Sequence, residues 1–283
     1  TETGLNISLN YLVKELSIAV NEENYVKAGQ LSEKIEEIKS ELKKLKTEIS
    51  SKIIVSAVKG IIPESGLLVG EHFHKKHAVD LNNIVVLAGP CHAEEVALER
   101  LSYLTIACAN LDIAGTVSEQ FSSNYIRTNT NDDVMGAEYA AMLKNIYAIA
   151  AGMAHGLGYG DNFQSVLMSN ATREMKRFIK KAHKMKRNIN ETVYLGDLLV
   201  TCYSLFSRNR MFGNMIGKGY TVKSAQMEMS MVAEGYYATK SAHLLNENNI
   251  KKTRLPIINA VYEILYEGKD AKKVFINLTD QLD

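Results

Sequence analysis

The chain has 283 residues, of which 46% are hydrophobic and 23% charged, the composition of an ordinary globular protein, so wholesale disorder is excluded. Lys and Arg total 33 against 32 for Asp and Glu, and a net charge of +1 leads us to expect no nucleic-acid partner. No apolar run approaches the roughly 18 to 20 residues of a membrane span, so none is expected.

The N-terminal segment has a composition of its own. Residues 22–47 are nearly half charged and contain no Pro. Leu31, Ile35, Ile38 and Leu42 recur at spacings of three and four, which indicates one face of a helix. A second apolar stripe upstream ends near Asn21. We therefore expect two short antiparallel helices, a helical hairpin, over residues 1–48. The first residue is Thr1 and not Met, which suggests a processed or incomplete product.

Residues 49–132 have the texture of an α/β layer. Three short β-branched or apolar runs suit buried strands, and a further extended segment follows them. Helical patterns lie between the first two pairs of runs. Buried strands that alternate with helices predict a parallel sheet. The expected strands are 53–61, 83–90, 104–109 and 124–134, and the expected helices are 64–77 and 92–100.

From residue 133 to residue 283 the pattern is helical, and we expect no strand. Long stretches with helical periodicity are separated by clusters of glycine, and about 150 residues suffice for a separate hydrophobic core. The expected helical stretches are 134–155, 161–187, 194–206, 221–247 and 256–266. The predicted fold class is thus α/β plus all-α, with a parallel sheet followed by a helical domain and preceded by the hairpin.

Polar groups follow two of the predicted strands. Lys59 and Gly60 close the first run (53–61), and at this carboxyl end Lys59 could hold an anion or polarise a carbonyl, or could be a solvated loop residue. Gly89, Pro90, Cys91 and His92 end the second strand at the same sheet edge. Cys91 could be a nucleophile, but a packed thiol is the favoured interpretation. With Cys108 and Cys202 it forms a scattered set of three, which favours a reducing cytoplasm over disulfides or structural zinc.

Two charged residues interrupt apolar helices. Lys144 lies in AAMLKNIYAIAAG, and Asp197 lies in YLGDLLVTC. A buried lysine is costly unless it is paired, so the two suggest a buried functional pair, with a purely structural ion pair as the alternative. Ser207, Arg208 and Asn209 supply a hydroxyl, a guanidinium fork and an amide that suit a phosphate ester, or form a basic surface turn.

Two further motifs suggest ligands only weakly. GMAHGLGYGDN (152–162) follows a helix and not a strand, so a helix end with a tight loop is favoured over a phosphate cradle. His72, His74 and His77 do not share one helix face with a set of carboxylates, and we expect no metal site.

Together, ordered motifs from about residue 53 to about residue 275 resemble the NAD(P)-dependent glycerol-3-phosphate dehydrogenases. They are VSAVKGI, AGPCHAEEVA, TNDDVMGAEYAAMLKNIYAIAAG, GLGYGDN, LGDLLVTC, SRNRMFG, VAEGYYATK and VYEILYEGKD. The resemblance implies a Rossmann domain and a helical substrate domain, NAD or NADP as cofactor, and NAD(P)H-dependent reduction of dihydroxyacetone phosphate to sn-glycerol 3-phosphate for phospholipid synthesis. It also allows a homodimer.

The resemblance assigns roles to individual residues. Lys144 matches the catalytic lysine, Lys59 a second active-site lysine that touches cofactor and substrate, and Asp197 the acid that orients them. The implied substrate-binding residues are Lys59, Gly89, Cys91, Lys144, Asp197, Ser207, Arg208 and Asn209. The implied cofactor-binding residues are Lys59, Ala93, Arg208, Val232 and Glu234. The family usually has Ser where this chain has Cys91.

The N-terminal segment departs from the family pattern. The family begins with a strand and a GxGxxG-type turn that binds pyrophosphate, and no such motif precedes Lys59 here. Instead, residues 21–42 resemble the UVR motif, a helical hairpin that mediates protein contacts, with a generic amphipathic hairpin as the alternative. We therefore expect a UVR-like hairpin at 1–48, a truncated cofactor domain at 49–132 and a substrate domain at 133–283. A non-catalytic module that binds a protein partner through the hairpin is the alternative function.

Overall fold

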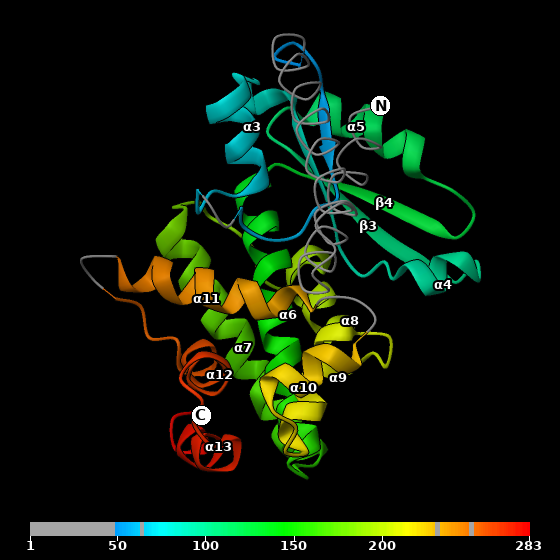
Figure 1. The fold of residues 1–283 in the computed structure, drawn as a ribbon. Coiled ribbons are helices and arrows are strands. Elements are labelled where there is room, and N and C mark those ends of the chain that lie inside the picture. Colours follow the sequence, from blue (N-terminus) through cyan, green and yellow to red (C-terminus); the bar gives the residue numbers. More distant parts are fainter. Residues whose placement is uncertain (1–48, 63–64, 230–232, 249–251) are drawn as a thin grey trace, which may run out of the picture. The chain divides into compact units, whose positions relative to one another are not determined.

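The computed structural model describes residues 49–62, 65–229, 233–248 and 252–283 (Figure 1), so the expected hairpin at 1–48 lies outside the described residues. The chain divides into two compact units, residues 1–52 with 74–80, and residues 53–73 with 81–283. In the first unit, Nδ1 of His74 lies 2.9 Å from the carbonyl oxygen of Val79. Helix α3 (Val69–His77) runs across the boundary between the units.

The second unit contains a four-stranded sheet. Its strands are β1 (Ile54–Ser56), β2 (Ile84–Ala88), β3 (Ser102–Cys108) and β4 (Ile126–Asn131), in the order β1-β2-β3-β4. The pairs β1–β2 and β3–β4 are parallel, which agrees with the predicted α/β class. The pair β2–β3 is antiparallel, with Val86 opposite Ala107, so the expectation of a wholly parallel sheet is wrong at this pair.

The connection between β2 and β3 explains the reversal. It contains only α4 (Ala93–Ala97), where the sequence pattern predicted a helix over 92–100. Five helical residues span about 7 Å, whereas the seven residues of β3 span roughly 23 Å. The short helix cannot carry the chain back along the strand, so the chain turns and pairs antiparallel. In contrast, the 11-residue α5 (Leu111–Phe121) joins the parallel strands β3 and β4.

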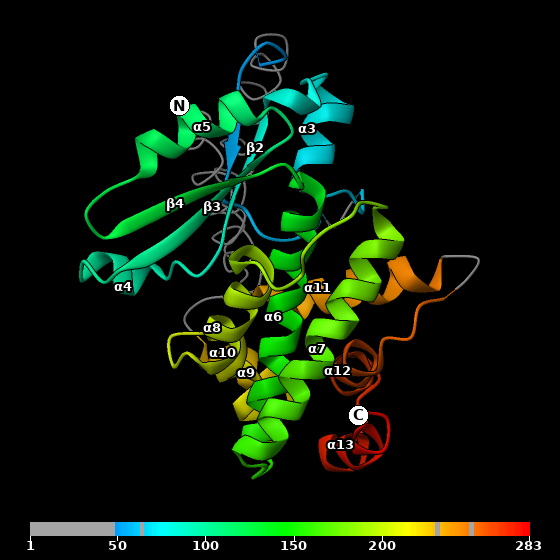
Figure 2. The same ribbon diagram turned by 180° about the vertical axis from the view of Figure 1, so that it is seen from behind.

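The two faces of the sheet are covered by different helices, as Figure 2 shows from behind. Side chains alternate between faces along a strand. Val85 and Ile106 accordingly share one hydrophobic cluster with Ala114 of α5. Val86 and Ala107, their neighbours in sequence, belong to the main core, which continues into the helical domain.

The helical domain surrounds α6 (Val134–Gly156), in which every residue from Gly136 to Ala154 is buried. A helix that is apolar on all sides requires neighbours on all sides. The further helical elements are α7 (Asp161–Ala182), the π-helical turn η2 (Thr192–Gly196), α8 (Asp197–Tyr203), α9 (Arg208–Gly217), α10 (Val222–Glu228), α11 (Glu234–Glu247), α12 (Pro256–Tyr266) and α13 (Ala271–Thr279). The described residues after β4 include no strand, in agreement with the predicted helical domain.

Helix α9 was not expected, because its glycines suggested a connection between helices. Gly213 and Gly217 lie inside α9 and face α6, where a Cβ atom would overlap the carbonyl oxygens of Ile149 and Met153. Gly152 and Gly156 of α6 face α9 in the same way. Four glycines thus let the backbones of α6 and α9 touch. Gly152 and Gly156 therefore serve helix packing and not a phosphate cradle.

Candidate functional site

Lys144 and Asp197 lie together in the core of the second unit. Lys144 is in the middle of α6 and 4% exposed, and Asp197 opens α8 and is 2% exposed. The Nζ atom of Lys144 donates to Oδ1 of Asp197 in a buried ion pair. The other carboxylate oxygen accepts the N–H of Gly89 at 3.3 Å. The pair therefore adjoins the carboxyl end of β2, where ligands of open α/β sheets bind.

Burial shifts the proton affinity of Lys144. It lowers the pKa of this ammonium group from its usual 10.5 to about 8, because a low-dielectric surrounding disfavours the charge. The carboxylate of Asp197 opposes the shift, and the positive charge of Lys59 adds to it. Lys59 is half-buried in the segment after β1. Three charged groups from separate elements thus act on one another, and Lys144 can exchange its proton near neutral pH.

Cys91 and His92, in the loop after β2, lie in the same electrostatic field. Burial raises the pKa of the Cys91 thiol, and the charge of Lys59 only partly opposes this. A thiol that stays protonated is a poor nucleophile, which favours the packed thiol over the nucleophile. Burial and then the charge of Lys144 lower the pKa of His92. His92 follows Cys91 in the motif, but the sequence did not single it out as a candidate.

The start of α9 is built by Ser207 and Asn209. Ser207 is buried and caps the helix, its Oγ accepting the N–H of Arg210 at 3.3 Å. Asn209 is 4% exposed, and its Oδ1 accepts the N–H of Gly235 in the first turn of α11 at 2.8 Å. A Cβ atom at Gly235 would lie 2.6 Å from the carbonyl oxygen of Asn145, the residue after Lys144. These contacts hold the N-termini of α9 and α11 against the stretch of α6 that carries Lys144.

Arg208 and Glu234 form an ion pair at this junction. Nη2 of Arg208 donates to Oε1 of Glu234 at 2.7 Å, and the side chains are 36% and 41% exposed. Two residues that the sequence suggested as cofactor contacts are therefore brought together. Ala93 is exposed at the start of α4 and takes no part in the hydrogen bonds described above. Val232 lies outside the described residues.

Three buried residues near the Lys144–Asp197 pair were not singled out as candidates from the sequence. The hydroxyl of Thr201 donates to the carbonyl oxygen of Asp197 at 2.6 Å, and its spacing of four residues from Asp197 could have indicated this. Asn145 is buried beside Lys144 in sequence. Burial raises the pKa of the Cys202 thiol, and the charge of Lys144 opposes this.

Asp133 fixes the start of α6. It caps the helix by accepting the N–H of Gly136 at 3.0 Å. It also binds Nε of Arg187 and the hydroxyl of Tyr194, both at 2.6 Å. Burial alone would raise its pKa, but the bonds from Arg187 and Tyr194 outweigh burial, so the pKa of Asp133 is lowered. This network anchors the segment that precedes α8, and α8 begins with Asp197.

Two other buried carboxylates bind backbone amides. Glu174 of α7 is fully buried and accepts the N–H groups of Ile257 and Ile258 at 2.9 Å, at the start of α12. Glu138 of α6 accepts the N–H of Gly70 at 3.0 Å. Burial raises the pKa of each carboxyl group to about 7. These residues fix helix positions and lie outside the predicted site.

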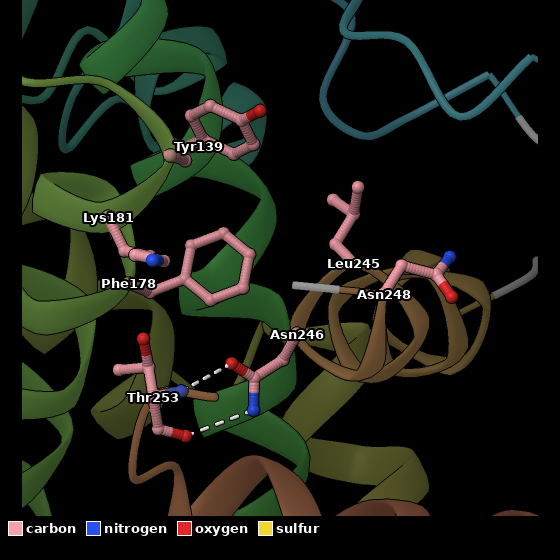
Figure 3. A pocket seen from close by; sticks show the side chains of 8 residues that line it. Tyr139, Phe178, Lys181, Leu245, Asn246, Asn248 and Thr253 are labelled. Carbon is pink, nitrogen blue, oxygen red and sulfur yellow. Dashed lines mark hydrogen bonds between the residues drawn. The ribbon is translucent and has the colours of Figure 1, made fainter. Parts of the chain in front are cut away.

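A cavity of about 310 Å³ lies elsewhere in the helical domain (Figure 3). Tyr139 and Phe178 form one side, and Leu245 of α11 projects from the other. The amide of Asn246 binds the backbone of Thr253, accepting its N–H at 2.8 Å and donating to its carbonyl oxygen at 3.0 Å. None of the predicted site residues lines this cavity.

The buried Lys144–Asp197 pair and the fold, a four-stranded sheet followed by a helical domain, can be compared with known proteins. A sequence model of the NAD-dependent glycerol-3-phosphate dehydrogenase C-terminus matches residues 133–276, slightly more than half of the chain. The chain belongs to the NAD-dependent glycerol-3-phosphate dehydrogenase family. The corresponding N-terminus model matches residues 12–114 and thus begins within residues 1–48, for which the sequence predicted a UVR-like hairpin.

Individual members of the glycerol-3-phosphate dehydrogenase family are also similar to this chain in sequence. The chain is 40% identical over 224 residues to the glycerol-3-phosphate dehydrogenase [NAD(P)+] of Listeria monocytogenes, covering 78% of this chain and 65% of that protein. It is 38% identical over 220 residues to the Clostridium tetani protein of the same name, covering 78% and 62%. The chain therefore spans a little under two thirds of the length of these relatives.

A solved structure supports the fold. The crystal structure of glycerol-3-phosphate dehydrogenase from Coxiella burnetii superposes with a TM-score of 0.76 at 28% identity, covering 83% of this chain and 73% of that one. The comparisons give no support to the alternative of a non-catalytic interaction module. Among the described residues, no helix is long and apolar enough to span a membrane.

Proposed function

We propose that this chain carries the chemistry of a glycerol-3-phosphate dehydrogenase, the NAD(P)H-dependent reduction of dihydroxyacetone phosphate to sn-glycerol 3-phosphate, for phospholipid synthesis. The observation that carries the proposal is the buried pair of Lys144 and Asp197 beside Gly89, with the pKa of Lys144 lowered to about 8. A proton donor with a pKa near neutrality suits the reduction of a carbonyl. The names of the Listeria and Clostridium relatives support the choice of reaction.

In this proposal Lys144 is the general acid. Its ammonium group donates a proton to the carbonyl oxygen of dihydroxyacetone phosphate, and in the reverse direction the neutral amine removes the hydroxyl proton. Asp197 orients Lys144 by accepting its hydrogen bond, and Gly89 holds the second oxygen of that carboxylate. Lys59 lies close enough for its charge to lower the pKa of Lys144, so it favours proton release.

The substrate phosphate is assigned to the start of α9. Ser207, Arg208 and Asn209 contribute a hydroxyl, a guanidinium and an amide there, and a helix N-terminus favours an anion. Gly89 and Cys91 line the carbonyl side of the substrate. A thiol donates a weaker hydrogen bond than the serine hydroxyl usual in the family, so this contact is expected to be weaker here.

The donor set also fits the cofactor, NAD or NADP. Lys59 and Arg208 supply cations for phosphate groups, Glu234 supplies an acceptor for ribose hydroxyls, and Ala93 presents a small side chain at the start of α4. Val232 completes the proposed set. When bound, the nicotinamide supplies the hydride for the reduction. The residues of this chain hold the nicotinamide beside Lys144, and Lys144 donates or removes the proton.

The domain organisation is part of the proposal. Residues 49–132 form the cofactor domain, truncated by the lack of a GxGxxG loop, and residues 133–283 the substrate domain. Residues 1–48 form the UVR-like hairpin that contacts a protein partner. Each charge-assisted hydrogen bond to the pyrophosphate that such a loop would make contributes about 1.5 to 3 kcal/mol, so weak cofactor binding is expected. The proposal also includes a homodimer. It further includes a cytoplasmic location, which the three free cysteines suggest.

The test is the loss of NADH or NADPH absorbance with dihydroxyacetone phosphate, using the full chain and Lys144→Ala. Turnover that the substitution abolishes supports the proposal. Turnover that survives the substitution overturns the role of Lys144. No turnover by a chain that melts cooperatively overturns the proposed activity of these 283 residues.

A further inference from the structure

The N-termini of two helices are fixed against each other in the helical domain. Helix α9 begins at Arg208 and α11 at Glu234. The buried amide of Asn209 accepts the N–H of Gly235 at 2.8 Å, so neither helix can shift along the other without losing this bond. The dipoles of both helices place partial positive charge at these N-termini, and the junction therefore attracts anions.

An anion of the protein itself already lies at this junction. The carboxylate of Glu234 accepts a hydrogen bond from Nη2 of Arg208 at 2.7 Å. Glu234 is also in the first turn of α11, where the helix dipole stabilises a negative charge. Both side chains are more than one-third exposed, so water screens the pair and opening it costs little free energy. The ion pair is accordingly stable enough to form and weak enough to be exchanged.

We propose that Glu234 is a positioning residue, which holds Arg208 in an ion pair that the substrate's phosphate group must displace. The inference rests on the proposed function, in which Arg208 binds that phosphate. A phosphate dianion offers the guanidinium more negative charge and more acceptor oxygens than a carboxylate does, so it can displace the carboxylate of Glu234. The carboxylate keeps the guanidinium oriented at the start of α9 until a ligand arrives.

The exchange makes the site selective for charge. A neutral polyol such as glycerol cannot replace Glu234, because it offers Arg208 no negative charge. Discrimination of this kind comes from an interaction that the wrong ligand fails to break, and not only from contacts with the right one. Removing the carboxylate of Glu234 should therefore strengthen the binding of phosphate ligands. A merely structural role for Glu234 predicts the opposite sign.

The test is isothermal titration of the full chain with sn-glycerol 3-phosphate, and separately with inorganic phosphate. Glu234→Gln should lower both dissociation constants by about 2- to 5-fold, the range that corresponds to an exposed ion pair. Glu234→Asp keeps the charge on a shorter side chain, so its dissociation constants should lie between those of wild type and Glu234→Gln. The matched control is Glu263→Gln, which removes an exposed ion pair with Lys269 at 3.2 Å and should leave them unchanged.

The outcomes separate this inference from the proposed function. Tighter binding by Glu234→Gln supports the inference, including the case in which only that variant binds measurably. Equal or weaker binding by Glu234→Gln, in a chain that still melts cooperatively, overturns it while the substrate assignment stands. If Glu234→Gln does not fold, weaker binding by Glu234→Asp than by wild type overturns it. If no variant binds either ligand, the proposed phosphate site is wrong and the inference falls with it.

Discussion

Two glycine-to-alanine substitutions in helices should change stability in opposite directions. Gly213 lies in α9 against α6, and Gly115 lies in α5 with no neighbouring atom within 4 Å of a Cβ atom. Alanine is the better helix former at both positions, by about 0.8 to 1 kcal/mol. The difference between the two sites therefore comes from the space around them.

The structure gives the size of the clash at Gly213. A Cβ atom there would overlap the carbonyl oxygen of Ile149 and lie 2.8 Å from its carbonyl carbon, whereas nonbonded carbon atoms are ordinarily about 3.5 to 4.0 Å apart. These atoms are backbone and cannot rotate away, so α9 must move away from α6. Overpacking costs about 1 to 3 kcal/mol, and an overlap with backbone atoms lies at the upper end of that range, so the cost exceeds the gain in helix propensity by about 2 kcal/mol.

Gly213→Ala should therefore lower the free energy of unfolding by about 2 kcal/mol, and Gly115→Ala should raise it by about 0.5 to 1 kcal/mol. Urea denaturation followed by circular dichroism measures both. In thermal melts, Gly213→Ala should lower Tm by about 4 to 8 °C. A Gly213→Ala variant as stable as the wild type would refute the inference that glycines set the distance between α6 and α9.

Three further predictions concern buried charges. The rate of dihydroxyacetone phosphate reduction should fall above about pH 8 as Lys144 loses its proton, and the oxidation rate should rise up to that pH; profiles independent of pH between 6 and 9 would contradict the role of Lys144. Asp197→Asn leaves Lys144 buried without its counter-charge and should cost about 3 to 5 kcal/mol in urea denaturation, and a change below 1 kcal/mol would argue against the buried pair. Glu174, with its pKa raised from 4.5 to about 7, binds a proton more tightly in the folded state. Its contribution to the free energy of unfolding is therefore complete below about pH 4.5 and is lost as the pH rises through 7. Glu174→Gln should flatten the fall in unfolding free energy over that range, and an unchanged slope would refute the assignment.

Local patterns in the sequence indicated much of the fold. The all-round apolar character of residues 134–155 predicted a buried helix, and α6 spans Val134–Gly156. The helix predicted at 256–266 is present as α12. Such patterns can be read from the sequence because helix periodicity and burial are properties of neighbouring residues. The family motifs, read in order, also led to the family that the comparisons establish. The roles of the site residues stay predictions.

Other features depended on contacts between distant residues. The pattern of β3 suits either direction, and the length of its connection to β2 decided the antiparallel pairing. Gly213 and Gly217 suggested a loop, because glycine disfavours an isolated helix, and packing on α6 reversed that preference.

The chemistry of the site divides in the same way. The sequence by itself determined which residues could act, since a lone Lys144 and a lone Asp197 in apolar helices must be paired when buried. The sequence also suggested that these two pair with each other, and the structure confirms the pair across 53 positions. Only the tertiary structure decided that Arg208 pairs with Glu234. The physical reason is that a charge specifies its need for a counter-charge locally, whereas the fold determines which counter-charge comes within reach.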